Sequence, residues 1–377
     1  MTQMLSIIEA GLHTTVQDLG RYGYQRFGVP VSGAMDSFAF KTANAIIGNS
    51  ETAAGLEITA LGPKIEFLED TRIAITGANL GPLIDGEPIE LWASVKVERG
   101  SVLTFSGPVE GLRAWLSVLG GIDVPLVMGS RSTYVKGEIG GFGGRALLPG
   151  DTVSTFDLEQ DQDPEIYLPQ DFDIPRYTGE FELRVVMGPQ DEAFTEAAID
   201  GLFTSTYTVS MDQDRMGCRL EGPLLEHLES PDIISDGSPL GAVQVSGDGM
   251  PIVLLNDRGT TGGYTKIANV VGVDVGLLAQ AMAGDAVRFT KVSVNHAHAL
   301  LRQQHAMLAS IGQEADIQLS RPKLHIRADG FPVEVLDESG SPLTLAESEG
   351  PSTMILGKAT IKKELHEFEL EIHEKSD

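Results

Sequence analysis

Short runs of β-branched and aromatic residues, separated by Gly, Pro and Asp, recur along most of this chain. Alternation of apolar and polar positions in such runs is typical of half-buried strands. The runs predict strands over Arg72–Thr76, Leu91–Val97, Ser101–Phe105, Arg113–Val118, Thr152–Phe156, Glu182–Val186, Tyr207–Met211, Ile252–Leu255 and Ala286–Val292. Apolar residues at helical spacing are rarer and predict helices over Asp36–Ile47, Asp191–Gly201, Leu277–Ala283 and Asn295–Ile311. The pattern therefore predicts a mainly β protein with a few short helices.

The polar stretches divide the chain into parts. Its 377 residues are enough for two domains and a remainder, at roughly 150 residues per domain. Between residues 157 and 180, Asp, Glu, Gln and Pro replace periodic apolar residues, which predicts an acidic linker. The composition shifts again near residue 320. We therefore expect a first domain over 1–156, a second over 181–320, and an appended β-rich segment over 321–377.

Charge and cysteine content exclude several classes of function. The net charge is −27, with 54 Asp and Glu against 27 Lys and Arg, so neither nucleic acid nor an anionic membrane is an expected partner. The single cysteine, Cys218, rules out an internal disulfide and a cysteine-rich metal site. No apolar run approaches the length of about 20 residues that a membrane span needs, and the N-terminus does not resemble a signal peptide. We expect a cytoplasmic protein.

The densest group of reactive side chains is Thr260-Thr261-Gly262-Gly263-Tyr264-Thr265-Lys266, which follows an apolar run. Paired glycines let the backbone turn so that its N–H groups face one point, where they can hold an anion or a carbonyl oxygen. The pattern of strand, donor-rich turn and strand favours part of a small-molecule site. A hairpin turn with polar side chains is the structural alternative.

Other polar clusters carry weaker indications. Asp36 can cap the helix that follows it, since its carboxylate can accept the first free N–H groups of that helix. Arg131, in a Gly- and Ser-rich stretch, can clamp a carboxylate or satisfy loop carbonyls. The doubled glycines match neither a dinucleotide fingerprint nor a phosphate loop, so the chain is not expected to bind ATP itself. His296, His298 and His305 do not share one helical face, and we expect no metal site.

Three blocks of sequence together resemble the biotin-dependent carboxyltransferase family. They are Thr14–Asp36 with its continuation Ala43–Asn49, then Gly120–Thr133, and finally Asp214–Leu220 with Thr260–Tyr264 and Gly284-Asp285. The family includes the carboxyltransferase domain of urea carboxylase and the C subunit of bacterial ATP-dependent 5-oxoprolinase, the KipA-type proteins. The resemblance implies two cyclophilin-like β-barrel domains with a cleft between them.

The resemblance implies alternative functions. As a C subunit, the chain joins A- and B-type subunits that together use ATP to hydrolyse 5-oxo-L-proline to L-glutamate, and it is inactive alone. As a carboxyltransferase component, it transfers a carboxyl group from biotin, held by a partner, to urea or another amide. As a KipA-type regulator, it binds a kinase inhibitor. No Met is followed by Lys, so the chain lacks the usual biotinylation site, which favours the 5-oxoprolinase alternative. No cofactor bound by this chain is expected.

Both enzymatic alternatives need hydrogen-bond donors for a developing oxyanion and a group that orients an amide. The predicted catalytic residues are Lys266, Tyr264 and Thr261. The predicted substrate-binding residues are Gln244, Gly262, Gly263, Gln280, Arg131, Asn79 and Asp36.

Overall fold

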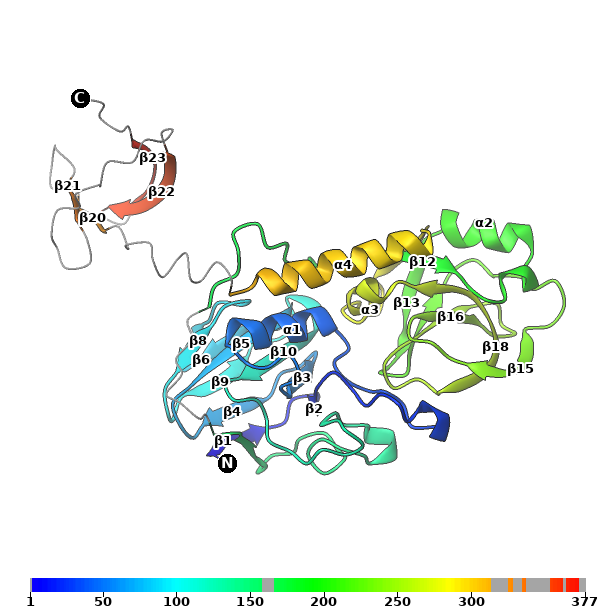
Figure 1. Cartoon of the computed structure of the whole chain (residues 1–377), viewed down its shortest axis with the longest axis horizontal. Helices are drawn as coiled ribbons and strands as arrows, with labels where there is room; N and C mark the ends of the chain where they lie inside the picture. The colour runs from blue at the N-terminus through cyan, green and yellow to red at the C-terminus, as the bar shows by residue number, and fades with distance from the viewer. Residues whose placement is uncertain are drawn as a thin grey trace. The chain divides into compact units, whose positions relative to one another are not determined.

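The computed structural model describes residues 2–157 and 166–312, together with the backbone of four later strands (Figure 1). The chain divides into two compact units, Met1–Asp316 and Ile317–Asp377. In the second unit, β20 (His325–Arg327) pairs with β21 (Glu334–Leu336), and β22 (Thr353–Ile361) pairs with β23 (Glu364–Ile372). Both pairs are antiparallel. No helix in the described part of the chain is both long and apolar enough to cross a membrane.

The first half of the larger unit contains two sheets. One has the strand order β11-β1-β4-β9-β6-β7, with β1 (Thr2–Glu9), β4 (Lys64–Phe67), β6 (Pro82–Ile84), β7 (Glu87–Pro88), β9 (Val102–Phe105) and β11 (Thr152–Thr155). The other has the order β2-β3-β10-β5-β8, with β2 (His13–Gln17), β3 (Gly55–Thr59), β5 (Thr71–Asn79), β8 (Val95–Val97) and β10 (Glu110–Val118). Apolar side chains of both sheets form one core, which includes Leu5, Ile58, Ile65, Ile75 and Leu116. Burial of each contributes roughly 1.5–3 kcal/mol.

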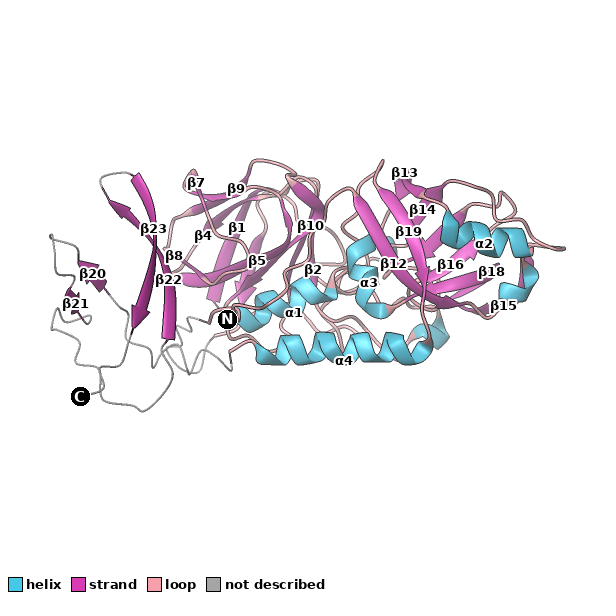
Figure 2. Cartoon of the chain, turned by 90° about the horizontal axis from the view of Figure 1, so that it is seen from above, coloured by secondary structure: helices cyan, strands magenta, loops and turns pink. Residues whose placement is uncertain are grey.

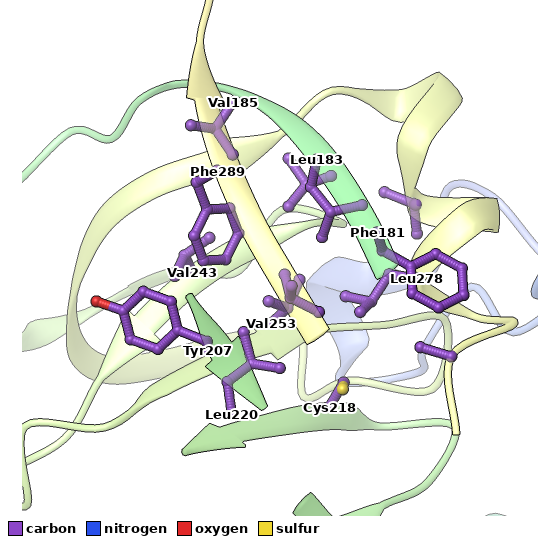
Figure 3. Close-up of a cluster of buried hydrophobic side chains, with 14 of the residues drawn as sticks. Phe181, Leu183, Val185, Tyr207, Cys218, Leu220, Val243, Val253, Leu278 and Phe289 are labelled. Carbon is purple, nitrogen blue, oxygen red and sulfur yellow. The ribbon is translucent and has the colours of Figure 1, made fainter. Parts of the chain in front are cut away.

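The second half contains one sheet of eight strands. They are β12 (Glu180–Met187), β13 (Tyr207–Gln213), β14 (Gly217–Glu221), β15 (Asp232–Gly237), β16 (Ala242–Val245), β17 (Pro251–Leu254), β18 (Thr261–Val270) and β19 (Ala286–Lys291). Their order is β12-β19-β13-β14-β17-β16-β18-β15, and β12 also pairs with β18, so the pairing returns to its start while β15 lies outside this ring. Figure 3 shows the core, where Tyr207, Phe289 and Leu183 pack around Val253. The mainly β prediction is confirmed, and the cyclophilin-like barrels stay a prediction.

Helices α1 (Ser37–Ile46) and α3 (Gly272–Leu278) contact each other where the two halves meet. The chain has the further helices α2 (Glu196–Thr204) and α4 (Val294–Ser310), with short 3-10 turns η1 (Gln25–Phe27), η2 (Val135–Gly137) and η3 (Asp191–Ala193). Figure 2 shows α3 between the two groups of strands, while α1 and α4 lie side by side. Phe38 of α1 stacks on Phe172 in the core that the second half builds. The two halves therefore share apolar contacts as well as polar ones.

The structure confirms some predicted elements and corrects others. The helix after Asp36 and the long helix near residue 295 are confirmed, with Asp36 capping the first, as expected, and Ser293 capping the second. The helix predicted over Asp191–Gly201 is instead a 3-10 turn followed by α2, because Thr195 caps α2. The helix predicted over Leu277–Ala283 ends at Leu278. The strand predicted over Leu91–Val97 begins only at Val95.

The expected linker over 157–180 is only partly described, since residues 158–165 lie outside the described part. Of the rest, Phe172 and Tyr177 are buried in the core around α1. The described part of this stretch is therefore packed against that core at Phe172 and at Tyr177. The domain boundaries at residues 156, 181 and 320 stay predictions.

Candidate functional site

A buried ion-pair cluster joins the two halves. Arg215, between β13 and β14, donates from Nε to Asp257 at 3.0 Å and from Nη1 to Glu57 of β3. Its Nη2 donates to the carbonyl oxygen of Gly33 at 2.7 Å. Burial alone would lower the pKa of Arg215, but the carboxylates of Glu57 and Asp257 outweigh burial and raise it. Each nitrogen of this guanidinium thus has an acceptor, and the cluster holds the halves together.

Two of the predicted binding residues, Asp36 and Gln280, meet at this junction. The Gln280 side chain donates to Asp36 at 2.8 Å and to the carbonyl oxygen of Arg113 at 3.0 Å, and it accepts from the N–H of Arg113 at 2.8 Å. The hydroxyl of Tyr177 also donates to Asp36, at 2.9 Å. Burial raises the pKa of Asp36, against the hydrogen bonds that lower it. These groups bind one another, which indicates a structural role at the junction.

A second polar cluster lies on strands β16 and β18. Gln244 and Lys266 are directly opposite each other on these neighbouring strands. Both are buried, with 8% and 1% of their surfaces exposed. In residues 2–157 and 166–312, neither Lys266 Nζ nor Gln244 Nε2 has a hydrogen-bond partner. Among the described residues, Lys266 pairs with the opposite charge of Asp236 in β15, whose Oδ2 is 3.5 Å from Lys266 Nζ. Unlike the guanidinium of Arg215, these two buried donors are unused.

A cavity of about 560 Å³ opens beside this cluster. Gln244 and Tyr264 line it, together with Asp214 and Arg219 and the apolar side chains of Ile252 and Leu254. The volume lies in the range of roughly 300–1,000 Å³ that small-molecule sites occupy. Tyr264 is 43% exposed and contributes to the cavity lining. The mixture of polar and apolar lining suits a small polar molecule.

The paired glycines do not form the expected turn. Gly262 and Gly263 lie inside β18, and the connection from β17 is made by residues 255–260 instead. Because successive N–H groups of a strand point in opposite directions, these two cannot converge on one oxygen. A Cβ on Gly262 would lie 2.6 Å from Gln244 Nε2. The glycine at this position therefore makes room for the Gln244 amide.

The remaining predicted residues are separate from this cluster. Arg131 donates to the carbonyl oxygen of Val124 at 3.1 Å, and its guanidinium lies 4.8 Å from the centre of the Phe156 ring. Asn79 accepts from the N–H of Gly81 at 2.9 Å. The side chains of Arg131 and Asn79 thus make these contacts with residues of the first half. Thr261 is exposed at the start of β18.

The structure adds residues that the sequence did not single out. Asp236 lies in an exposed edge strand whose polar sequence carried no periodic signal. Arg215 lay in a block noted only for its resemblance. Cys218 is buried in the core, and burial raises the pKa of its thiol to about 12, which keeps it un-ionised at neutral pH. In the described part of the chain, no group of His, Cys, Asp and Glu is placed to hold a metal.

Comparison with known proteins places the chain among carboxyltransferase relatives. A family model described as the carboxyltransferase domain, subdomain A and B, matches residues 27–291. The C subunit of 5-oxoprolinase from Escherichia coli is 37% identical over 294 residues, which cover 78% of this chain and 93% of that protein. The protein of the same name from Haemophilus influenzae is 32% identical and covered over 99% of its length, with 83% of this chain matched.

Relatives of a second kind are larger proteins. The urea amidolyase of Saccharomyces cerevisiae is 34% identical over 81% of this chain, which corresponds to 18% of that protein. The crystal structure of Kluyveromyces lactis urea carboxylase superposes with a TM-score of 0.77 at 28% identity, covering 90% of this chain and 33% of that one.

Proposed function

Because the chain belongs to the carboxyltransferase family of subdomains A and B, we propose that it is the C subunit of an ATP-dependent 5-oxoprolinase. In this role it joins A- and B-type subunits in the cytoplasm and is inactive alone. The supporting observation is the share of each relative's length that the similarity spans. The similarity spans 93% and 99% of two proteins named as the C subunit of 5-oxoprolinase, whereas it spans 18% of the yeast urea amidolyase.

The reaction opens the lactam of 5-oxo-L-proline. The bond between the lactam carbonyl carbon and nitrogen breaks, the oxygen of water is added to that carbon, and the nitrogen gains a proton to give L-glutamate. Hydrolysis of ATP to ADP and phosphate, at a site on another subunit, drives the step. We place the substrate in the cavity beside Gln244 and Tyr264, and Lys266 is opposite Gln244 on the neighbouring strand. A buried ammonium stabilises negative charge on the substrate more strongly than an exposed one would.

The second candidate function is carboxyl transfer to urea or another amide. The similarity to urea amidolyases and to urea carboxylase favours it. In that reaction, biotin on a partner protein delivers the carboxyl group, and the same cavity receives the amide. The two candidates share the site and differ in the partners and in the product.

Reconstitution of the complex from purified subunits distinguishes the two candidate functions. The purified chain is mixed with its A- and B-type subunits and ATP, and glutamate formed from 5-oxoproline is measured, with omission of each subunit in turn. We expect glutamate only from the complete mixture. Glutamate formation without this chain would remove the proposed role, and carboxylation of urea with a biotinylated carrier would establish the second candidate.

Site variants test the placement of the substrate. We expect Lys266→Ala and Tyr264→Phe each to lower the rate more than tenfold, which corresponds to about 1.4 kcal/mol of barrier. Lys291→Ala, which removes an exposed charge on β19, is the control and should leave the rate unchanged. Near-normal rates in both site variants would move the active site elsewhere.

A further inference from the structure

Two buried donors on β16 and β18 point to a missing acceptor. Lys266 Nζ and Gln244 Nε2 have no hydrogen bond within the described part of the chain. A buried amide or ammonium without an acceptor is costly, so such groups are normally paired in a working protein. Directly opposite residues on antiparallel strands have side chains on the same face of the sheet. Both donors therefore lie on one face of the sheet, and Gln244 also lines the cavity.

We propose that Lys266 and Gln244 bind the carboxylate of an amide substrate, and that Asp236 occupies this place until the substrate arrives. The inference rests on the proposed function, because 5-oxoproline carries such a carboxylate next to its lactam. A carboxylate accepts hydrogen bonds only, through two oxygens, which suits an ammonium beside an amide N–H. Urea offers one neutral carbonyl oxygen and would bring no negative charge to Lys266.

The position of Asp236 suits a temporary partner. Its Oδ2 is 3.5 Å from Lys266 Nζ, so it balances the charge without forming a hydrogen bond. Its side chain is 57% exposed. Among the described strands, β15 pairs only with β18, and its register is irregular between Asp232 and Asp236. A side chain on an exposed, irregular edge strand can turn towards solvent at low cost, which frees Lys266 for another carboxylate.

The space around Gln244 supports the same assignment. Gly262, opposite Asp236 on β18, has no side chain to fill the gap between the strands. A Cβ there would press against Gln244 Nε2, at 2.6 Å. The same Cβ would lie 3.1 Å from the hydroxyl oxygen of Ser238. The glycine at this position therefore leaves space beside the Gln244 amide.

Equilibrium titration tests the proposal. The full chain, alone and mixed with its partner subunits, is titrated with L-5-oxoproline and with 2-pyrrolidone, the same lactam without the carboxylate. We expect the unsubstituted protein to bind 5-oxoproline at least tenfold more tightly. Lys266→Met should abolish this preference. Asp236→Asn should increase affinity for 5-oxoproline by about three- to tenfold, because the competing carboxylate is removed, and should leave 2-pyrrolidone binding unchanged.

Matched controls isolate the effect of charge. Asp232→Asn makes the same change on the same exposed strand, and Lys291→Met removes an exposed cation, so neither should alter the preference. The proposal is overturned if Asp236→Asn weakens binding, if Lys266→Met keeps the preference, or if 5-oxoproline shows no saturable binding. Failure of the proposed function would look different: the preference would persist while the assembled mixture formed no glutamate.

Discussion

Arg215 and Lys266 are both buried cations in the larger unit, and they differ in how their nitrogens are used. Arg215, at the junction of the halves, places its guanidinium against Glu57, Asp257 and the carbonyl oxygen of Gly33. Lys266, on β18, has one exposed carboxylate at 3.5 Å. The first arrangement is complete without a ligand and the second is not. Unused donors therefore distinguish Lys266 from Arg215, whereas burial and charge alone do not.

The net charge of the protein makes the difference between Arg215 and Lys266 more important for the binding of an anion. With a net charge of −27, the protein repels an anionic substrate at long range. Binding of a carboxylate then requires a local cation in a region of low dielectric constant, where the attraction is strong. At the junction, Arg215 is already neutralised by two carboxylates. Within residues 2–157 and 166–312, the only carboxylate paired with Lys266 is that of the exposed Asp236. The second cation is thus better placed to attract an anion.

The largest expected effect is at the junction. Arg215→Met would leave Glu57 and Asp257 buried without their counterion, and we expect the free energy of unfolding to fall by about 3–5 kcal/mol. Urea denaturation followed by tryptophan fluorescence measures this change. The control is Arg219→Met, which breaks a partly exposed pair with Asp248 and should cost less than about 1 kcal/mol. Equal losses in both variants would contradict the structural role of Arg215.

A smaller loss is expected for Gln280→Leu. The substitution removes the donor to Asp36 and the acceptor for the N–H of Arg113, both buried, and we expect a loss of about 2–3 kcal/mol. The same denaturation experiment applies. Gln303→Leu, on the exposed side of α4, is the matched control and should change stability by less than about 0.5 kcal/mol. If Gln280→Leu were equally mild, the amide would not be part of the junction.

Local signals predicted local structure well. The helix after Asp36 was predictable because the capping residue and the apolar spacing lie within a few residues of each other. The partner of Asp36 was not, because Gln280 is 244 positions away and reaches it only in the folded chain. Asp36 and Gln280 were therefore predicted as binding residues, although the structure gives both a place in the junction.

In the candidate site, too, contacts between residues far apart in the sequence could not be predicted. The sequence singled out Gln244, Tyr264 and Lys266 by residue type, but it could not show that Gln244 and Lys266 are opposite each other. The paired glycines were misread as a turn, because tertiary packing overrides local preference. Gly262 lies in a strand, where the absence of a Cβ makes room for a neighbour on another strand.

The smallest expected change in stability is the most discriminating. Lys266→Met replaces a buried ammonium that lacks a hydrogen bond in residues 2–157 and 166–312 with an apolar chain of similar length. Asp236 remains hydrated, since its side chain is 57% exposed. We therefore expect the free energy of unfolding to stay constant or to rise by about 1 kcal/mol, the opposite sign to Arg215→Met. Saturating 5-oxoproline should stabilise the unsubstituted protein and not this variant. A loss above about 2 kcal/mol, in the range of a broken buried pair, would show that Lys266 has a structural partner and that the contrast with Arg215 does not hold.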